Sequence, residues 1–284
     1  PGQGVVGYTG QFYALFFMQI TLRLDYLTTY TLIGASLLLG TPFFIFFGWL
    51  SDKIGRLKII LAGCAIAAVT YFPMFKGLTH YVNPALEEFQ AKTKVSVTAD
   101  LAGCNFHLFV GPWSKFTDCD RTKDFLIKQG LSFDTVAGPA GSAPVVQIGS
   151  ATINGYSEAG MKAALEQQGY PSKGADKSRI NYGMTLLILF IFLIYVTMVY
   201  GPIAAFLVEL FPTRIRYTSM SLPYHIGNGW FGGMLPLTAT AMVAAKGDIY
   251  YGLWYPIVVS VMTLVVGAIF LKETKERDIT TYEH

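Results

Sequence analysis

One ionisable side chain lies deep inside a long uncharged stretch of this sequence. His225 stands within residues 217–245, beside Tyr224 and three residues before Asn228. Because positions i and i+3 share a helix face, His225 and Asn228 are expected to lie together. Imidazole titrates near neutral pH, so a proton-carrying role for His225 is chemically sensible. The alternative is a neutral histidine that is hydrogen-bonded between two helices.

Three uncharged polar side chains near the start of the chain are further candidates for a binding site. Tyr8, Gln11 and Tyr13 lie within residues 4–22, which contain no Asp, Glu, Lys or Arg. Their hydroxyl and amide groups suit the carboxylate or hydroxyl of a small substrate. The alternative is that they pack between helices or lie at a membrane surface.

Six uncharged stretches must position these side chains, and each is long enough to cross a bilayer as a helix. About 20 apolar residues cross the roughly 30 Å hydrocarbon layer. The stretches are residues 4–22, 26–51, 59–75, 180–208, 217–245 and 249–271. We therefore predict an all-α membrane protein with six transmembrane helices. Gly229 and Gly233, in the fifth stretch, have the spacing of a close helix contact.

The charged residues are concentrated in one internal segment. The 284 residues are 52% hydrophobic and 14% charged, with a net charge of +3, whereas soluble proteins carry about 25% charged residues. Residues 77–180 contain 20 of the 39 Asp, Glu, Lys and Arg residues. We predict membrane helices in residues 1–76, a water-exposed insert in residues 77–180, and further membrane helices with a tail in residues 181–284. Such a low net charge argues against a nucleic-acid partner.

The loops between the stretches differ in charge, and this difference predicts the orientation of the chain. Three basic residues stand on the insert's side, namely Arg23, Lys76 and Lys246. Eight stand on the other side, namely Lys53, Arg56, Lys58, Arg214, Arg216, Lys272, Lys275 and Arg277. Because basic loops stay in the cytoplasm, we expect both chain ends to be cytoplasmic and residues 77–180 to be extracytoplasmic.

A short loop motif follows the second stretch. Residues 48–58 read GWLSDKIGRLK. This segment resembles the loop signature of the major facilitator superfamily, with matches at Gly48, Ser51, Asp52, Gly55, Arg56 and Lys58. Leu57 departs from the pattern, because that position is usually basic. Gly55 can adopt a positive φ in so short a turn, and Asp52 can pair with Arg56.

A second segment is similar to the metabolite:proton symporter branch of the same superfamily. Residues 209–216 read ELFPTRIR and introduce the fifth stretch, so Glu209, Arg214 and Arg216 match that branch. Glu209 is expected to pair with Arg214 or Arg216 as a conformational latch. The opening residues 2–17 are similar to the same branch, although Gly7 stands where Trp is common.

The resemblance implies a fold and an activity. The six predicted helices would be the last six of a twelve-helix transporter, with the N-terminal half of the same protein as a missing partner. The two halves would enclose a central site and alternate between outward-open and inward-open states. The resemblance implies a plasma-membrane transporter in a lipid bilayer, driven by a proton gradient. It implies neither an enzyme nor a cofactor.

The insert is expected to be a small α/β domain. Strands are predicted near residues 94–99, 132–136 and 144–149, and helices near 118–129 and 157–168. Cys104 and Cys119 are its two cysteines, and an oxidising exterior favours a disulfide between them. No His/Cys cluster has zinc spacing, so no metal is expected.

The leading hypothesis is therefore proton-coupled symport of a small metabolite such as an organic acid, an amino acid or a betaine. A uniporter or exporter of the same superfamily is one alternative. A membrane-anchored extracytoplasmic binding or sensor domain is the other, although an anchor would not require the loop motifs. The sequence does not name the substrate, the coupling ion, the direction of transport, the role of the insert or the oligomeric state.

Overall fold

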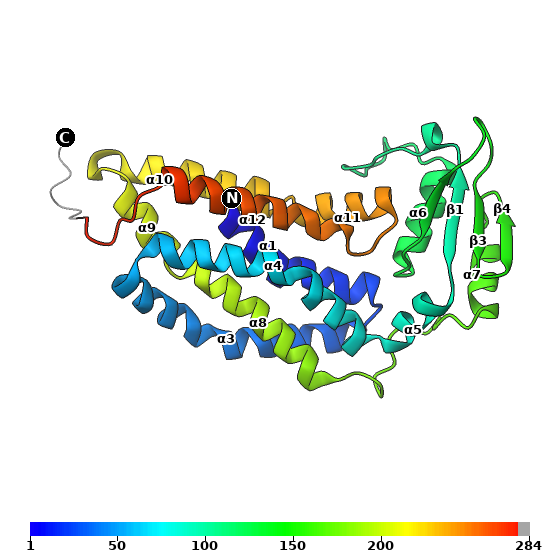
Figure 1. The fold of residues 1–284 in the computed structure, drawn as a ribbon, viewed down its shortest axis with the longest axis horizontal. Helices are drawn as coiled ribbons and strands as arrows, with labels where there is room; N and C mark the ends of the chain where they lie inside the picture. The colour runs from blue at the N-terminus through cyan, green and yellow to red at the C-terminus, as the bar shows by residue number, and fades with distance from the viewer. Residues whose placement is uncertain (278–284) are drawn as a thin grey trace.

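The computed structural model of the protein describes residues 1–277 as a helical body with a sheet at one end (Figure 1). The last residues of the predicted third part, 278–284, lie outside this range. Four helical stretches have the length and hydropathy of a membrane span, namely Tyr26–Ile54 (α3), Arg56–Val82 (α4), Tyr182–Leu210 (α8 and α9) and Tyr251–Phe270 (ending in α12). The predominantly helical membrane architecture is thus confirmed, while the count of six spans stays a prediction.

The first and fifth uncharged stretches are helical but interrupted by wider π-helical turns. The first consists of α1 (Gly2–Tyr8), a π turn (Thr9–Tyr13), α2 (Ala14–Phe16) and a second π turn (Phe17–Thr21). The fifth consists of α10 (Arg216–His225), a π turn (Ile226–Gly232) and α11 (Leu235–Lys246). Such turns insert extra residues into the helix and are frequent at functional sites.

Glycine lets these two interrupted segments approach each other closely. A Cβ atom added to Gly4 would collide with the backbone carbonyl of Gly227, and one added to Gly232 would lie 2.7 Å from the Tyr8 ring. By contrast, a Cβ on Gly229 would meet no atom within 4 Å. The close crossing therefore uses Gly4, Gly227 and Gly232 instead of the predicted Gly229–Gly233 pair.

The insert contains a four-stranded mixed sheet in the order β2-β1-β3-β4. Strand β1 pairs in parallel with β2 and antiparallel with β3, and β3 pairs antiparallel with β4. The bounds are β1 (Val95–Ala99), β2 (Asp134–Ala137), β3 (Val145–Ile148) and β4 (Ala151–Asn154), with helices α5 (Pro84–Lys92), α6 (Asp118–Lys128) and α7 (Glu158–Gln167). Alternate side chains such as Val97 and Val146 are fully buried, so one face of the sheet carries the core. Strand β4 and helix α5 were not predicted from the sequence.

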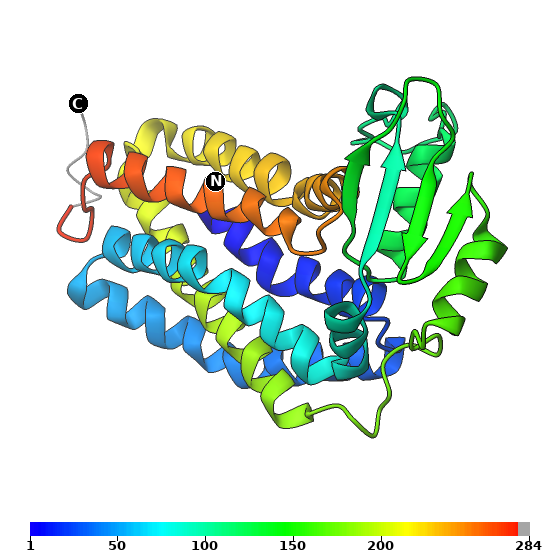
Figure 2. The same cartoon turned by 45° about the vertical axis from the view of Figure 1, so that its right-hand side comes forward.

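The insert contacts the ends of both interrupted segments (Figure 2). The Arg23 guanidinium, just after the first segment, donates to Gln129 Oε1 at 3.0 Å. The Gly247 carbonyl, just after α11, accepts from the Phe133 amide at 2.7 Å. Gly247 has a positive φ of 81°, and a Cβ there would press against Phe133. Helix α4 continues past residue 76 to Val82, so a single helix leads into the insert.

Candidate functional site

Four polar side chains meet where the two interrupted segments pass α8 (Tyr182–Tyr200). We call them the amide–tyrosine cluster: Gln3, Tyr200, Tyr224 and Asn228. The Asn228 amide donates to Gln3 Oε1 at 3.0 Å and to the Tyr224 carbonyl at 3.1 Å. The Tyr224 and Tyr200 hydroxyls lie 3.2 Å apart. Helix α1, α8 and the fifth uncharged stretch are thereby joined through hydrogen bonds between neutral polar groups.

Two atoms of this cluster are buried without a hydrogen-bond partner among the described residues. They are Gln3 Nε2, a donor, and Asn228 Oδ1, an acceptor. The whole Gln3 residue is only 7% exposed. An unpaired buried polar group costs about 1–3 kcal/mol, so a ligand that satisfies both atoms would be favoured.

His225 makes polar contacts with Ser221, and its ring centroid lies 5.9 Å from that of Tyr224. It is exposed, and its Nδ1 lies 2.7 Å from the Ser221 carbonyl on its own helix. The expected common face of His225 and Asn228 rests on α-helical spacing, whereas a π turn begins at Ile226, between the two residues. His225 therefore lies on an open surface of this body, while Asn228 points toward α1.

The three candidates of the first segment occupy different environments. Tyr13 is buried among aromatic rings, with its centroid 5.5 Å from that of Phe75, so it belongs to the core. Tyr8 is half-buried with its ring 5.1 Å from that of Phe12, and Gln11 is also half-buried. A Cβ on Gly7 would lie 3.6 Å from the Tyr200 ring, so the absence of a large side chain at position 7 leaves room for Tyr200.

A network of charged residues lies at the end of the body opposite the insert. We call it the Arg56 network: Asp52, Arg56, Glu209, Glu273 and Thr274. The Arg56 guanidinium contacts the Asp52 carboxylate and donates to Glu209 Oε1 at 2.9 Å. The side chains of Arg56 and Glu209 are 10% and 12% exposed, whereas that of Asp52 is 63% exposed. The buried part of the network is thus the Arg56–Glu209 pair, between α4 and α9 (Ile203–Leu210).

Glu273 and Thr274, which follow α12 (Trp254–Phe270), complete the network. The Glu273 carboxylate accepts from the backbone amides of Arg56 at 2.8 Å and Leu57 at 3.1 Å, at the start of α4. Burial acts to raise the pKa of Glu273, but hydrogen bonds from four backbone amides outweigh it and hold this pKa below its ordinary value. The Thr274 hydroxyl donates to Glu209 Oε2 at 2.6 Å. Sequence reasoning counted this segment only for its basic residues and missed Glu273, although an acid beside a membrane span was a usable signal.

The remaining residues of the two loop motifs support this network. Gly55 has a φ of 120°, and a Cβ there would collide with the Glu273 carboxylate, so the turn requires glycine on both counts. The Gly48 carbonyl accepts from the Ser51 hydroxyl at 2.6 Å. The Glu209 carboxylate pairs with the guanidinium of Arg56, whereas the sequence predicts Arg214 or Arg216. Arg216 Nε donates to the Phe211 carbonyl at 3.1 Å, and Arg214 is exposed.

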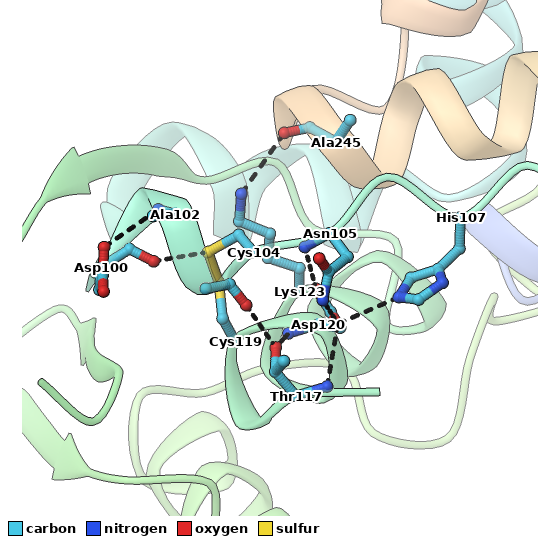
Figure 3. The surroundings of a disulfide bond; sticks show 11 residues. Asp100, Ala102, Cys104, Asn105, His107, Thr117, Cys119, Asp120, Lys123 and Ala245 are labelled. Carbon is cyan, nitrogen blue, oxygen red and sulfur yellow. Dashed lines mark hydrogen bonds and ion pairs between the residues drawn. A yellow bond between two sulfur atoms is a disulfide. The ribbon is translucent and has the colours of Figure 1, made fainter. Parts of the chain in front are cut away.

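Within the insert, Cys104 and Cys119 form a disulfide with their Cα atoms 5.3 Å apart (Figure 3). Cys119 lies in the first turn of α6, and Cys104 begins the irregular segment that precedes it. Over residues 1–277, no group of three or more His, Cys, Asp or Glu side chains is placed to hold a metal ion.

Comparison with known proteins adds a family to this geometry. A family model described as "Sugar (and other) transporter" matches residues 155–284. A Haemophilus influenzae protein named "Putative metabolite transport protein" is 41% identical over 93 residues, covering 31% of this chain and 20% of the relative. These similarities support a transporter of the major facilitator superfamily.

Two further relatives are also named as transport proteins. A second Haemophilus influenzae "Putative metabolite transport protein" is 34% identical over 87 residues, covering 29% of the chain and 18% of the relative. The glycine betaine/proline/ectoine/pipecolic acid transporter of Dickeya dadantii is 32% identical over 79 residues, covering 28% of the chain and 15% of the relative. The matched part spans at most about a fifth of these relatives. No solved structure matches significantly.

These similarities indicate the class of protein to which the matched part of this chain is related. The matched family and relatives are transporters, not enzymes. Together with the long apolar helices, these similarities indicate a multi-pass membrane protein. The Arg56 network and the amide–tyrosine cluster are therefore two candidate functional sites in a chain similar to transporters.

Proposed function

We propose that this chain is the C-terminal six-helix half of a secondary transporter that moves a small metabolite by alternating access. The observation that carries the proposal is the amide–tyrosine cluster. It joins three helical segments, its Asn228 lies in the π turn Ile226–Gly232, and it holds two unpaired polar atoms, Gln3 Nε2 and Asn228 Oδ1. Discontinuous helices with free polar groups are the usual way to build a substrate site within a membrane.

The cluster favours a compact polar substrate. Its amide and phenol groups offer hydrogen bonds without a net charge, which suits a zwitterion or a hydroxylated metabolite better than a strong anion. The name of the Dickeya dadantii relative includes glycine betaine and proline, which are zwitterions. We therefore place amino acids and betaines ahead of organic acids as substrates of this chain.

The Arg56 network is proposed to act as a latch for one of the two access states. It links the α3–α4 turn, α9 and the segment after α12, so separating these segments requires breaking the Arg56–Glu209 pair. In this proposal the latch is cytoplasmic, residues 77–180 are extracytoplasmic, and the N-terminal half covers the exposed surface of α10. The membrane is the plasma membrane.

Proton coupling is assigned to His225. Its imidazole is the one ionisable His, Asp, Glu, Lys or Arg side chain inside the predicted spans away from their ends. Its exposed position on α10 would place it at the surface that meets the other half. A proton could then reach or leave the imidazole as the two halves separate.

Uptake by proteoliposomes containing the complete protein tests the proposal. Counterflow of labelled betaine, proline and organic acids identifies the substrate, and an imposed proton gradient then drives accumulation. Gradient-independent equilibration would make the protein a uniporter. The absence of counterflow for every compound, in vesicles shown to contain folded protein, would favour the membrane-anchored binding domain instead.

A further inference from the structure

A cavity of about 720 Å³ lies between the insert and α11, far from the amide–tyrosine cluster. Its walls come from the irregular segment before α6, from α6 itself and from one side of α11. Among its lining residues are His107, Phe116, Lys123, Leu237, Ala241 and Ala245. The volume falls within the range of small-molecule sites, which is about 300–1,000 Å³.

Lys123, whose contact with Ala245 is drawn in Figure 3, places a poorly compensated positive charge in this cavity. The residue is 8% exposed, and its ammonium has no carboxylate within 4 Å among the described residues. Its hydrogen-bond acceptor is the Ala245 carbonyl of α11, at 3.5 Å. Burial lowers the pKa of Lys123, while the charge of Asp120 acts in the opposite direction. A buried ammonium with one long hydrogen bond to a neutral carbonyl is a site for an anion.

The acidic side chains near the cavity are already engaged. The buried Asp120 carboxylate accepts from the Asn105 amide at 2.7 Å and from the Thr117 amide at 2.9 Å. It also accepts from the Asn105 side chain at 3.3 Å and lies 3.0 Å from His107 Nε2. Asp124 pairs with Lys128 at 2.6 Å. Neither carboxylate is therefore free to move to Lys123.

Most of the remaining lining is apolar or aromatic, and Asn105, Ser114, Arg121, Lys128 and Thr240 add polar and charged groups to it. The His107 and Phe116 rings stack with their centroids 4.3 Å apart, and α11 contributes leucine and alanine side chains. An inorganic ion would leave most of this surface unfilled, whereas an organic acid would place its carboxylate on the ammonium and its hydrocarbon part against the walls.

We propose that the cavity between the insert and α11 binds a small organic carboxylate through the Lys123 ammonium. Because Lys123 also holds the last turn of α11, the bound carboxylate lies beside the end of an interrupted membrane segment. This second site is independent of the amide–tyrosine cluster, so it is tested without reference to transport.

Binding is measured by isothermal titration calorimetry on the purified protein in lipid nanodiscs. The probes are propionate and benzoate, each compared with its neutral amide. We expect both carboxylates to bind and the amides to bind about tenfold more weakly or not at all, because a neutral amide cannot pair with the charge of the ammonium. Equal binding of acid and amide, or no binding of either acid, would refute the proposal.

Three variants locate the site. Lys123→Met is expected to weaken benzoate binding about tenfold or more, whereas Lys162→Met, at an exposed lysine paired with Glu158, should bind as the parent protein does. If Lys123→Met does not fold, Ala244→Phe narrows the cavity from the α11 side and should also abolish binding. Unchanged affinity in the folded variants at positions 123 and 244 would place any carboxylate site elsewhere.

Discussion

The Arg56 network and the amide–tyrosine cluster hold helices together in opposite ways. In the Arg56 network, Glu209 accepts hydrogen bonds from Arg56 and Thr274, and Glu273 caps the start of α4. In the amide–tyrosine cluster, the contacts are between neutral groups, and Gln3 Nε2 and Asn228 Oδ1 remain unpaired. The first arrangement is complete without a ligand, and the second is not.

The helices that carry the two groups also differ in regularity. Long uninterrupted helices, α3 and α4, meet at the Arg56 network. The amide–tyrosine cluster is supplied largely by segments with π turns, whose backbone can shift by a residue without unfolding. We infer that charge pairing stabilises one conformation, while neutral polar groups on interrupted helices respond to substrate. The predictions below test this division of roles.

Arg56→Gln should have the largest effect on stability. It leaves the buried Glu209 carboxylate without its cation, and removing one partner of such a pair costs about 3 kcal/mol or more. Thermal unfolding of the protein in detergent or nanodiscs measures the loss. Adding Glu209→Gln should restore part of the lost stability, because the double variant no longer buries an unpaired charge.

Asp52→Asn is the matched comparison within the same network. Because the Asp52 carboxylate is 63% exposed, its pairing should contribute less than about 1 kcal/mol. We expect slower transport with unchanged substrate affinity and nearly unchanged unfolding. If Asp52→Asn destabilised the protein as much as Arg56→Gln, the Arg56–Glu209 pair would not be the main contact.

Asn228→Ala should reduce transport about tenfold or more while changing stability little, because it removes groups assigned to substrate and a single amide contact between helices. Substrate affinity in proteoliposomes is the measurement. Gly229→Ala is the control, since it lies in the same π turn and an added Cβ meets no atom within 4 Å. Equal transport by both variants would remove the amide–tyrosine cluster from the substrate pathway.

His225→Gln should lower proton-driven accumulation several-fold and leave exchange without a gradient intact. Glutamine keeps a hydrogen bond to the Ser221 carbonyl but does not titrate near neutral pH. Accumulation and exchange are measured in the same vesicles. Loss of both would indicate a substrate or packing role, and retention of both would place the proton site in another residue.

Acidification should weaken the Arg56 network slightly through Glu273. Its pKa is lowered in the folded protein, so its contribution to stability is present above the ordinary value of 4.5 and is lost as the pH falls through the folded value. We expect Glu273→Gln to reduce the fall in melting temperature below about pH 4.5 by about 2–4 °C. Glu276→Gln, at an 88% exposed side chain, should leave that fall unchanged.

The long helices were predictable because a long stretch without charged residues indicates a helix in an apolar environment. Residues 26–51 and residues 182–208 of the fourth stretch lie within long helical stretches of the structure. The crossing of Gly4 with Gly227, in the π turn Ile226–Gly232, was not predictable, because it is a contact between residues far apart in sequence. The spacing of Gly229 and Gly233 marked the region without specifying which glycines touch.

The candidate sites show the same limit. Asp52 and Arg56 are one helical turn apart along the sequence, and their predicted contact is present. Glu209 was assigned to nearby Arg214 or Arg216, but the chain becomes extended at Phe211 and leads away from α9. Arg56, 153 positions away in the sequence, donates the hydrogen bond to Glu209 instead. Local spacing therefore predicted contacts within a loop and failed for contacts between spans.

The hydrogen bond from Phe133 to the Gly247 carbonyl has a consequence for biosynthesis. On the ribosome, the insert is translated before α8, α10 and α11. The Gly247 carbonyl, which accepts the hydrogen bond from Phe133, therefore does not yet exist when the strands of the sheet have been synthesised. The Lys123–Ala245 contact must wait for the same residues. The insert can therefore pack against the end of α11 only after the fifth uncharged stretch has been synthesised. This packing is one of the last steps in the folding of the chain.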